Sequence, residues 1–138
     1  MADLIALYGT LMSGLAPRPG APELTPHIEL IGDCLLAGRL YDFGPYPCLV
    51  PGNAHVRAEL WRPISHDALA ILDRWEEHDP QSLEASVYVR REARLLEPEL
   101  DAWVYYWNRS TAGLAVIADG DWRAHSTGRS DRTPPSTG

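Results

Sequence analysis

A buried stretch near the start of the chain stops at a glycine, in the string Tyr8-Gly9-Thr10-Leu11. A strand that runs into a glycine turn exposes successive backbone N–H groups that no neighbouring strand satisfies, and a group of such donors suits a carboxylate or an oxyanion. These four residues therefore predict a small-molecule site. An ordinary strand-ending turn is the competing interpretation, because glycine is common in turns of every kind.

A helix is predicted over residues 66–77, which contain neither glycine nor proline. Ser65 is a plausible N-cap, and Pro80 prevents the helix from continuing. At about 100° per residue, the apolar side chains form one arc along this helix. The members of the arc are Ala68, Leu69, Ile71, Leu72 and Trp75. The side chains expected to face water include Asp67, Arg74 and Glu77.

Glu76 falls inside this apolar arc, so its carboxylate is expected to project toward the core. Burial of an ionised carboxylate is costly unless the group is paired, protonated with a raised pKa, or placed at a cavity. One interpretation is a structural ion pair with Arg39, Arg57 or Arg90. The other is a carboxylate held in a pocket for proton transfer, with its pKa raised by the apolar neighbours.

Other catalytic patterns are missing from the sequence. The five histidines show no HExxH or paired Cys/His spacing, so neither a metal nor a cofactor is expected. The sequence contains no GxSxG elbow and no nucleotide-binding loop, which leaves a hydrolase triad without support. Cys34 and Cys48 are expected to be free structural thiols rather than a disulfide or a redox pair.

Composition narrows the classes of partner. A chain of 138 residues that is 45% hydrophobic fits one domain with its own core. A net charge of -7 argues against nucleic acid and against an anionic membrane, which leaves small molecules or proteins. The N-terminus lacks the basic segment and long apolar run of a secretory signal, so a cytoplasmic location is expected. The oligomeric state stays unknown.

Alternation and β-branched or aromatic content predict a chain dominated by strands. The predicted strands lie at about 3–8, 34–41, 54–62, 86–96, 101–107 and 114–118. Residues 14–26 are rich in proline and glycine and are expected to form a surface loop. The domain is expected to span residues 1–123. Residues 124–138 are expected to be a disordered tail, because they hold too few apolar groups to offset the entropy of ordering.

Several short motifs occur in order between about residues 4 and 123. They are Tyr8-Gly9-Thr10-Leu11, Gly38-Arg39-Leu40-Tyr41-Asp42, Gly44-Pro45-Tyr46-Pro47, Glu59-Leu60-Trp61, Leu72-Asp73 with Glu76, Tyr88 with Arg90, and Ala102-Trp103-Val104-Tyr105. Together and in this order, they resemble the γ-glutamylcyclotransferase superfamily in its AIG2-like branch. The resemblance implies an α+β fold, a small mixed β-barrel with one or two flanking helices and a cavity at its mouth.

The resemblance also implies an activity and a set of site residues. The family releases 5-oxoproline from γ-glutamyl compounds and is classed with transferases or lyases. Backbone amides of the loop matched by Tyr8, Gly9, Thr10 and Leu11 would hold the γ-glutamyl group. The glutamate matched by Glu76 would be the general acid and base.

Supporting substrate-binding roles are expected for three tyrosines and one arginine. Tyr8, Tyr88 and Tyr105 could each offer a hydroxyl to a cavity, although buried tyrosines more often pack in a core with their hydroxyls satisfied. Arg90 is expected to be a pocket cation for the substrate α-carboxylate or a brace for Glu76, with a surface role as the alternative.

Two positions depart from the family pattern. Met12 replaces a basic residue that is common there, and Glu77 replaces the glycine usual after the catalytic glutamate. Both changes favour a γ-glutamyl amine over glutathione as the substrate, because a second carboxylate would repel an acidic leaving group. The alternatives are a non-catalytic metabolite-binding module on the same fold, and cyclotransfer on a carrier-bound γ-glutamyl intermediate in a biosynthetic pathway.

Overall fold

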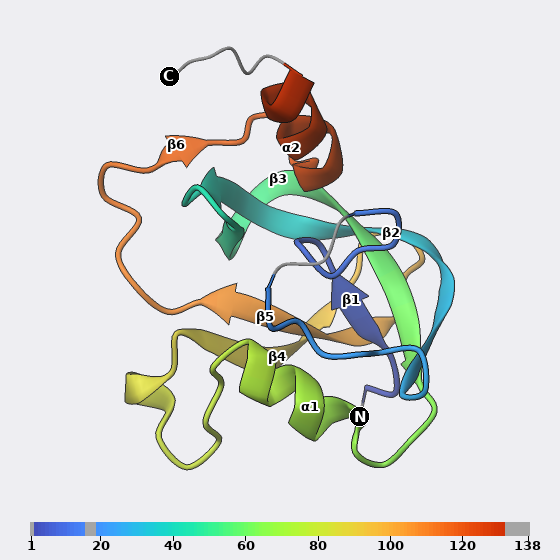
Figure 1. The fold of residues 1–138 in the computed structure, drawn as a ribbon. Helices are drawn as coiled ribbons and strands as arrows, with labels where there is room; N and C mark the ends of the chain where they lie inside the picture. The colour runs from blue at the N-terminus through green and yellow to red at the C-terminus, as the bar shows by residue number, and fades with distance from the viewer. Residues whose placement is uncertain (1, 16–18, 132–138) are drawn as a thin grey trace.

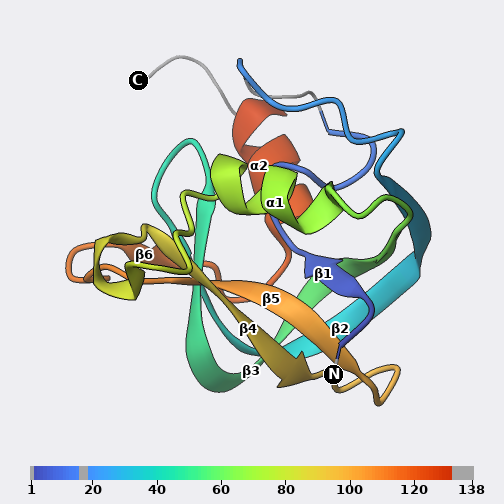
Figure 2. The same ribbon diagram turned by 90° about the horizontal axis from the view of Figure 1, so that it is seen from below.

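A computed structural model describes residues 2–15 and 19–131 of the chain. Its strands are β1 (Ile5–Leu7), β2 (Ile28–Asp42), β3 (Pro47–Pro63), β4 (Tyr88–Arg94), β5 (Asp101–Trp107) and β6 (Ala115–Val116). Its helices are α1 (Ala68–Trp75), the 3₁₀ turn η1 (Leu83–Ala85) and α2 (Trp122–Asp131). The strands form one sheet in the order β4-β5-β1-β3-β2-β6. The sheet curls into a half-barrel, with α1 beside β4 and β5 and α2 on the side of β2 and β3 (Figures 1 and 2).

The short strand β1 lies at the centre of this sheet. It pairs antiparallel with β3 and parallel with β5, where Ile5 lies opposite Trp103. All three residues of β1 are buried. This mixed pairing confirms the α+β class that the sequence predicted, and it brings the end of β1 next to strands from both halves of the chain.

The hairpin of β2 and β3 is longer than predicted. Its pairing runs from Ile28 opposite Pro63 to Asp42 opposite Pro47, with irregular register between Leu30 and Gly32 and again after Gly38. The predicted strands covered only residues 34–41 and 54–62, whereas the observed strands also include Gly32, Pro51 and Gly52 beside the irregular pairs. β-Bulges insert an extra residue without ending a strand, which explains the difference.

Two apolar clusters fill the two sides of the curled sheet. One contains α1 and the β4–β5 aromatics, including Leu72, Tyr105 and Trp107. The other lies under α2 and includes Leu36 and Trp122. Both cysteines are free and buried, as predicted, and burial raises the pKa of each thiol to about 12.

The predicted helix is present but starts later than expected. Its N-cap is Asp67 rather than Ser65, and no side chain caps it. The Ser65 hydroxyl is instead 2.8 Å from Nδ1 of His27, in the segment that precedes β2. The N-cap prediction was therefore wrong, because a tertiary hydrogen bond takes the hydroxyl that a cap would have used.

The disordered tail expected from residue 124 is corrected in part, because α2 continues to Asp131. Trp122 is buried at the start of this helix, and Arg123 donates to Glu59 Oε2 at 2.7 Å. His125 Nε2 lies 2.8 Å from Asp42 Oδ2. These anchors supply the interactions that composition alone did not reveal. Residues 132–138 of the expected tail lie outside the described residues.

The loop expected over residues 14–26 contains no helix or strand in its described parts, residues 14–15 and 19–26. Residues 16–18 lie outside the description. Among residues 2–15 and 19–131, no helix has the length and apolar character needed to cross a membrane.

Candidate active site

A pocket of about 340 Å³ opens where β1 ends, between the C-terminus of α1 and the β2–β3 turn. It is lined by Ala6, Leu7, Tyr8, Gly9, Thr10, Leu11, Tyr46, Pro47, Arg74, Trp75, Glu76, Glu77, Val87, Tyr88 and Tyr105. The structure therefore brings together most of the residues that were predicted to form a site. These are Tyr8, Gly9, Thr10, Leu11, Glu76, Tyr88 and Tyr105. Arg90 is the one predicted site residue that is not in the lining.

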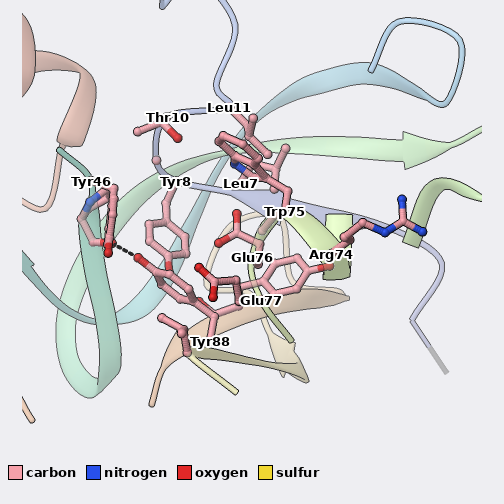
Figure 3. Close-up of a pocket in the computed structure, with 15 residues that line it drawn as sticks. Leu7, Tyr8, Thr10, Leu11, Tyr46, Arg74, Trp75, Glu76, Glu77 and Tyr88 are labelled. Carbon is pink, nitrogen blue, oxygen red and sulfur yellow. Dashed lines mark hydrogen bonds between the residues drawn. The ribbon is translucent and has the colours of Figure 1, made fainter. Parts of the chain in front are cut away.

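Glu76 stands at the end of α1, as its C-cap residue. Its backbone N–H donates to the carbonyl of Leu72 at 2.9 Å, so the last turn of the helix fixes its position. Figure 3 shows its carboxylate among the rings of Tyr8, Trp75 and Tyr88. The cation of Arg90, one of the partners considered for Glu76, is bound to a different carboxylate.

The turn after Glu76 is a Schellman motif. The N–H of Glu77 donates to the Arg74 carbonyl at 3.2 Å, and the N–H of His78 donates to the Asp73 carbonyl at 2.8 Å. Glu77 has a φ of 56°, in the left-handed region that glycine usually occupies at this position. The side chain of Glu77 is exposed, as predicted, yet it lies at the pocket wall rather than away from the site.

The Gly9 position explains the turn at the end of β1. A Cβ at Gly9 would lie 3.0 Å from Cγ and 3.2 Å from Cδ of Pro47, closer than ordinary van der Waals contact. The Met12 N–H donates to the Gly9 carbonyl at 3.1 Å and closes the turn. The loop therefore passes tightly against the β2–β3 turn, and residues 9–11 form one wall of the pocket.

This loop is held by hydrogen bonds at both ends, buried at Tyr8 and partly buried at Ser13. Before it, the Tyr8 hydroxyl donates to the Tyr105 carbonyl at 2.5 Å. After it, Ser13 donates from its N–H and its hydroxyl to the carboxylate of Glu59, at 2.7 and 2.5 Å. Glu59 is only 3% exposed, and Arg123 neutralises it. The anchoring of the loop by Glu59 and Arg123 could not be read from local sequence patterns, because the two residues are far apart in the chain.

The tyrosine hydroxyls are used within the protein. Tyr88 donates to the Pro47 carbonyl at 2.6 Å, the bond drawn as a dashed line in Figure 3. Tyr8 donates to β5, as described above. Burial raises the pKa of Tyr8 and of Tyr88 well above the ordinary tyrosine value, and the negative charge of Glu76 contributes to both shifts. Their rings form pocket wall, while their hydroxyls support the backbone.

Asp73 supports the pocket residue Tyr105 and was not selected as a site residue from the sequence. It is 9% exposed and accepts hydrogen bonds from Arg90 Nε at 2.7 Å, Arg90 Nη2 at 3.1 Å and the Tyr105 hydroxyl at 2.7 Å. The Arg90 guanidinium also lies 4.5 Å from the centre of the Trp103 ring. Asp73 therefore joins α1 to β4 and β5. Its spacing of one helical turn from Glu76 was the signal available in the sequence.

This network changes the expected role of Arg90. Burial lowers the pKa of Arg90, but the hydrogen bond and charge of Asp73 outweigh that effect and raise it. Burial also raises the pKa of Tyr105, and the hydrogen bond to Asp73 makes the second-largest contribution to this rise. The prediction of Arg90 as a pocket cation is corrected, because its donors are directed to Asp73 instead.

We expect Asp73→Asn to lower the free energy of unfolding by about 3 kcal/mol, since it leaves the largely buried guanidinium of Arg90 without its countercharge. Urea unfolding measures the change. The matched control is Asp101→Asn, which removes an exposed partner of Arg94 at 3.4 Å and should cost less than about 1 kcal/mol. Equal losses for both variants would contradict the role given to Asp73.

The pocket tyrosines also predict a pH dependence. A phenol is neutral when protonated, so a raised pKa in the folded state adds stability below the unfolded value of about 10, and this stability is lost as the pH rises further. Absorbance at 295 nm should show Tyr8, Tyr88 and Tyr105 protonated until circular dichroism reports unfolding. Ionisation of all six tyrosines of the chain with the circular dichroism unchanged would contradict this prediction.

Comparisons with known proteins agree with the fold. The family described as gamma-glutamyl cyclotransferase, AIG2-like, matches residues 5–124. The gamma-glutamylcyclotransferase family protein YtfP of Escherichia coli K12 is 32% identical over 119 residues, which are 86% of this chain and 94% of that protein. A putative gamma-glutamylcyclotransferase of Vibrio cholerae is 31% identical over 124 residues, covering 88% and 96% of the two chains.

Solved structures give the same result. The solution structure of E. coli YtfP superposes with a TM-score of 0.64 at 29% identity, covering 89% of this chain and 98% of that chain. An AIG2-like protein from mouse shares the fold with a TM-score of 0.59 at 23% identity, over 78% and 79% of the two chains. The chain therefore belongs to the AIG2-like gamma-glutamyl cyclotransferase family.

Proposed function

We propose that this protein releases 5-oxoproline from a γ-glutamyl amine by intramolecular cyclotransfer. The observation that carries the proposal is the position of Glu76, whose carboxylate lies in a pocket opposite the Gly9–Leu11 loop. An acid–base group and a wall of backbone are together in a space of about 340 Å³, within the usual range for small-molecule sites. Family membership supports the same reaction.

The reaction needs few protein groups because the substrate carries its own nucleophile. The α-amine attacks the γ-carbonyl carbon, a C–N bond forms to close the five-membered lactam, and the C–N bond to the leaving amine breaks. Glu76 accepts one proton from the α-ammonium before attack and a second from the attacking nitrogen as the lactam forms. It passes each proton to the leaving nitrogen, which departs as an ammonium ion. General acid–base catalysis of this kind contributes about 10²- to 10⁴-fold.

The loop would bind the reacting carbonyl. Backbone N–H groups of residues 9–11 are suited to the oxyanion that develops on the γ-carbonyl oxygen. The anchors at Tyr8 and Ser13 keep those groups in one arrangement before the substrate arrives. Such preorganisation also favours the folded substrate conformation in which the amine lies near the carbonyl carbon.

The remaining residues act through the walls of the pocket. Tyr8 and Tyr88 present ring faces, and Tyr105 lines the pocket while its hydroxyl holds Asp73. Arg90 positions α1 through Asp73 instead of contacting the substrate.

An amine leaving group fits the charges better than glutathione. Glu76 and Glu77 both line the pocket, and a substrate with a further carboxylate near them would be repelled. Met12 is buried in the core cluster under α2, so no cation at this position offsets them. The expected site of action remains the cytoplasm.

The test is 5-oxoproline release from γ-glutamyl amines, γ-glutamyl dipeptides and glutathione. Glu76→Gln should lower turnover of the amines by at least about 10²-fold, because the amide cannot move the proton. The control Glu84→Gln alters an exposed glutamate of the 3₁₀ turn and should leave turnover unchanged.

Two outcomes would overturn this function. Equal turnover by wild type and Glu76→Gln would remove Glu76 from the chemistry. No release from any compound, with a γ-glutamyl ligand still raising the melting temperature, would favour the metabolite-binding module. Faster turnover of glutathione than of every amine would contradict the substrate preference.

A further inference from the structure

We infer that Glu77 selects substrates whose leaving amine carries a second, positively charged amino group. This inference rests on the proposed function and names its substrate class more narrowly, as γ-glutamyl derivatives of diamines. It combines three features of one pocket: the fixed backbone of Glu77, the distribution of charge around the lining, and the aromatic rings beside it.

The backbone of Glu77 is fixed from both directions. Its N–H donates to the Arg74 carbonyl at 3.2 Å, and its carbonyl accepts from the Val87 N–H at 3.0 Å. A φ of 56° is unfavourable for a residue with a long side chain, and yet a glutamate stands here. The fixed backbone holds the start of this side chain at the pocket wall.

The charged groups of the lining leave Glu77 available to the leaving group. Besides Glu77, the lining contains Glu76 and Arg74. Glu76 faces the reacting α-amine in the proposed mechanism. Figure 3 shows the Arg74 guanidinium extending away from the two carboxylates. The charge that an extended leaving group meets is therefore negative.

Aromatic rings line the same space. Tyr46, Trp75 and Tyr88 all contribute to the pocket, and the Tyr46 and Tyr88 ring centres are 6.2 Å apart. Phe43 stacks on Tyr46 at 5.0 Å and supports that ring. Aromatic faces attract cations and pack against methylene chains. A carboxylate beside such rings fits an alkyl chain that ends in an ammonium group.

The test uses three γ-glutamyl compounds of similar length and different end charge. They are the γ-glutamyl derivatives of 1,4-diaminobutane, of butylamine and of 4-aminobutyrate, which end in a cation, a methyl group and an anion. Wild type should show the highest kcat/KM for the cation and the lowest for the anion. We expect kcat/KM to fall about 5-fold from the cation to the methyl group and about 5-fold again to the anion. This is the factor that corresponds to the interaction of one pair of unit charges near 4 Å in water.

Variants at position 77 separate charge from shape. Glu77→Gln keeps the size of the side chain and should bring the three kcat/KM values within about 2-fold of one another. Glu77→Gly should lose the ranking as well, and it should raise the melting temperature because glycine adopts the positive φ without strain. Added salt should weaken the wild-type ranking and leave that of Glu77→Gln unchanged.

A binding measurement separates this inference from the proposed function. Analogues of the same three compounds that lack the α-amine cannot cyclise, so their binding can be measured by calorimetry. Wild type should bind the cationic analogue most tightly. Glu77→Gln should bind all three analogues with equal affinity. That result without any turnover of the parent compounds would overturn the cyclotransferase reaction and support the role of Glu77. Turnover with an unchanged ranking in Glu77→Gln would support the reaction and overturn the role of Glu77.

Discussion

The position of the pocket depends on the hydrogen bonds that the buried carboxylate of Asp73 accepts. This carboxylate binds the Arg90 guanidinium of β4 and the Tyr105 hydroxyl of β5, and it belongs to the last full turn of α1. A buried charge of this kind is tolerated only when it is paired and hydrogen-bonded. Because those bonds are directional, they fix how α1 meets the sheet, and this in turn determines where Glu76 lies.

The same connections extend from the helix to the loop that faces it. The Tyr105 hydroxyl donates a hydrogen bond to Asp73, and the Tyr105 carbonyl accepts one from the Tyr8 hydroxyl. The backbone of β5 thus lies between the helix that carries Glu76 and the start of the Gly9–Leu11 loop. A second buried carboxylate, Glu59, holds the far end of that loop through Ser13. Glu76 and the Gly9–Leu11 loop are consequently connected through β5 by buried hydrogen bonds.

Local sequence patterns were enough to find helix α1, most of the strand positions and several of the pocket residues. Alternation located the strands, and the helical arc with the glycine break led to Glu76 and to the loop after Tyr8. Tertiary bonds were not readable in the same way. Ser65 bonds to His27 instead of capping α1, and α2 is anchored by Trp122 and by bonds to distant strands. Composition could not reveal those contacts, because each joins segments that are far apart in the chain.

The role of Arg90 shows where residue type alone misleads. A cation near a predicted site suggests an anionic ligand, but the Arg90 guanidinium donates to the buried carboxylate of Asp73 in α1. Glu77 shows the opposite case. Its departure from glycine was visible in the sequence, whereas its φ of 56° and its place in the pocket lining became clear only in three dimensions.

The most direct test of this account is a crystal structure of the protein with a γ-glutamyl amine analogue that lacks the α-amine and therefore cannot cyclise. We expect the γ-carbonyl oxygen to accept hydrogen bonds, at about 2.7 to 3.1 Å, from backbone N–H groups of residues 9–11. We also expect the α-carbon of the analogue to face the carboxylate of Glu76. An analogue bound outside this pocket, or bound with its γ-carbonyl directed away from the loop, would contradict this account.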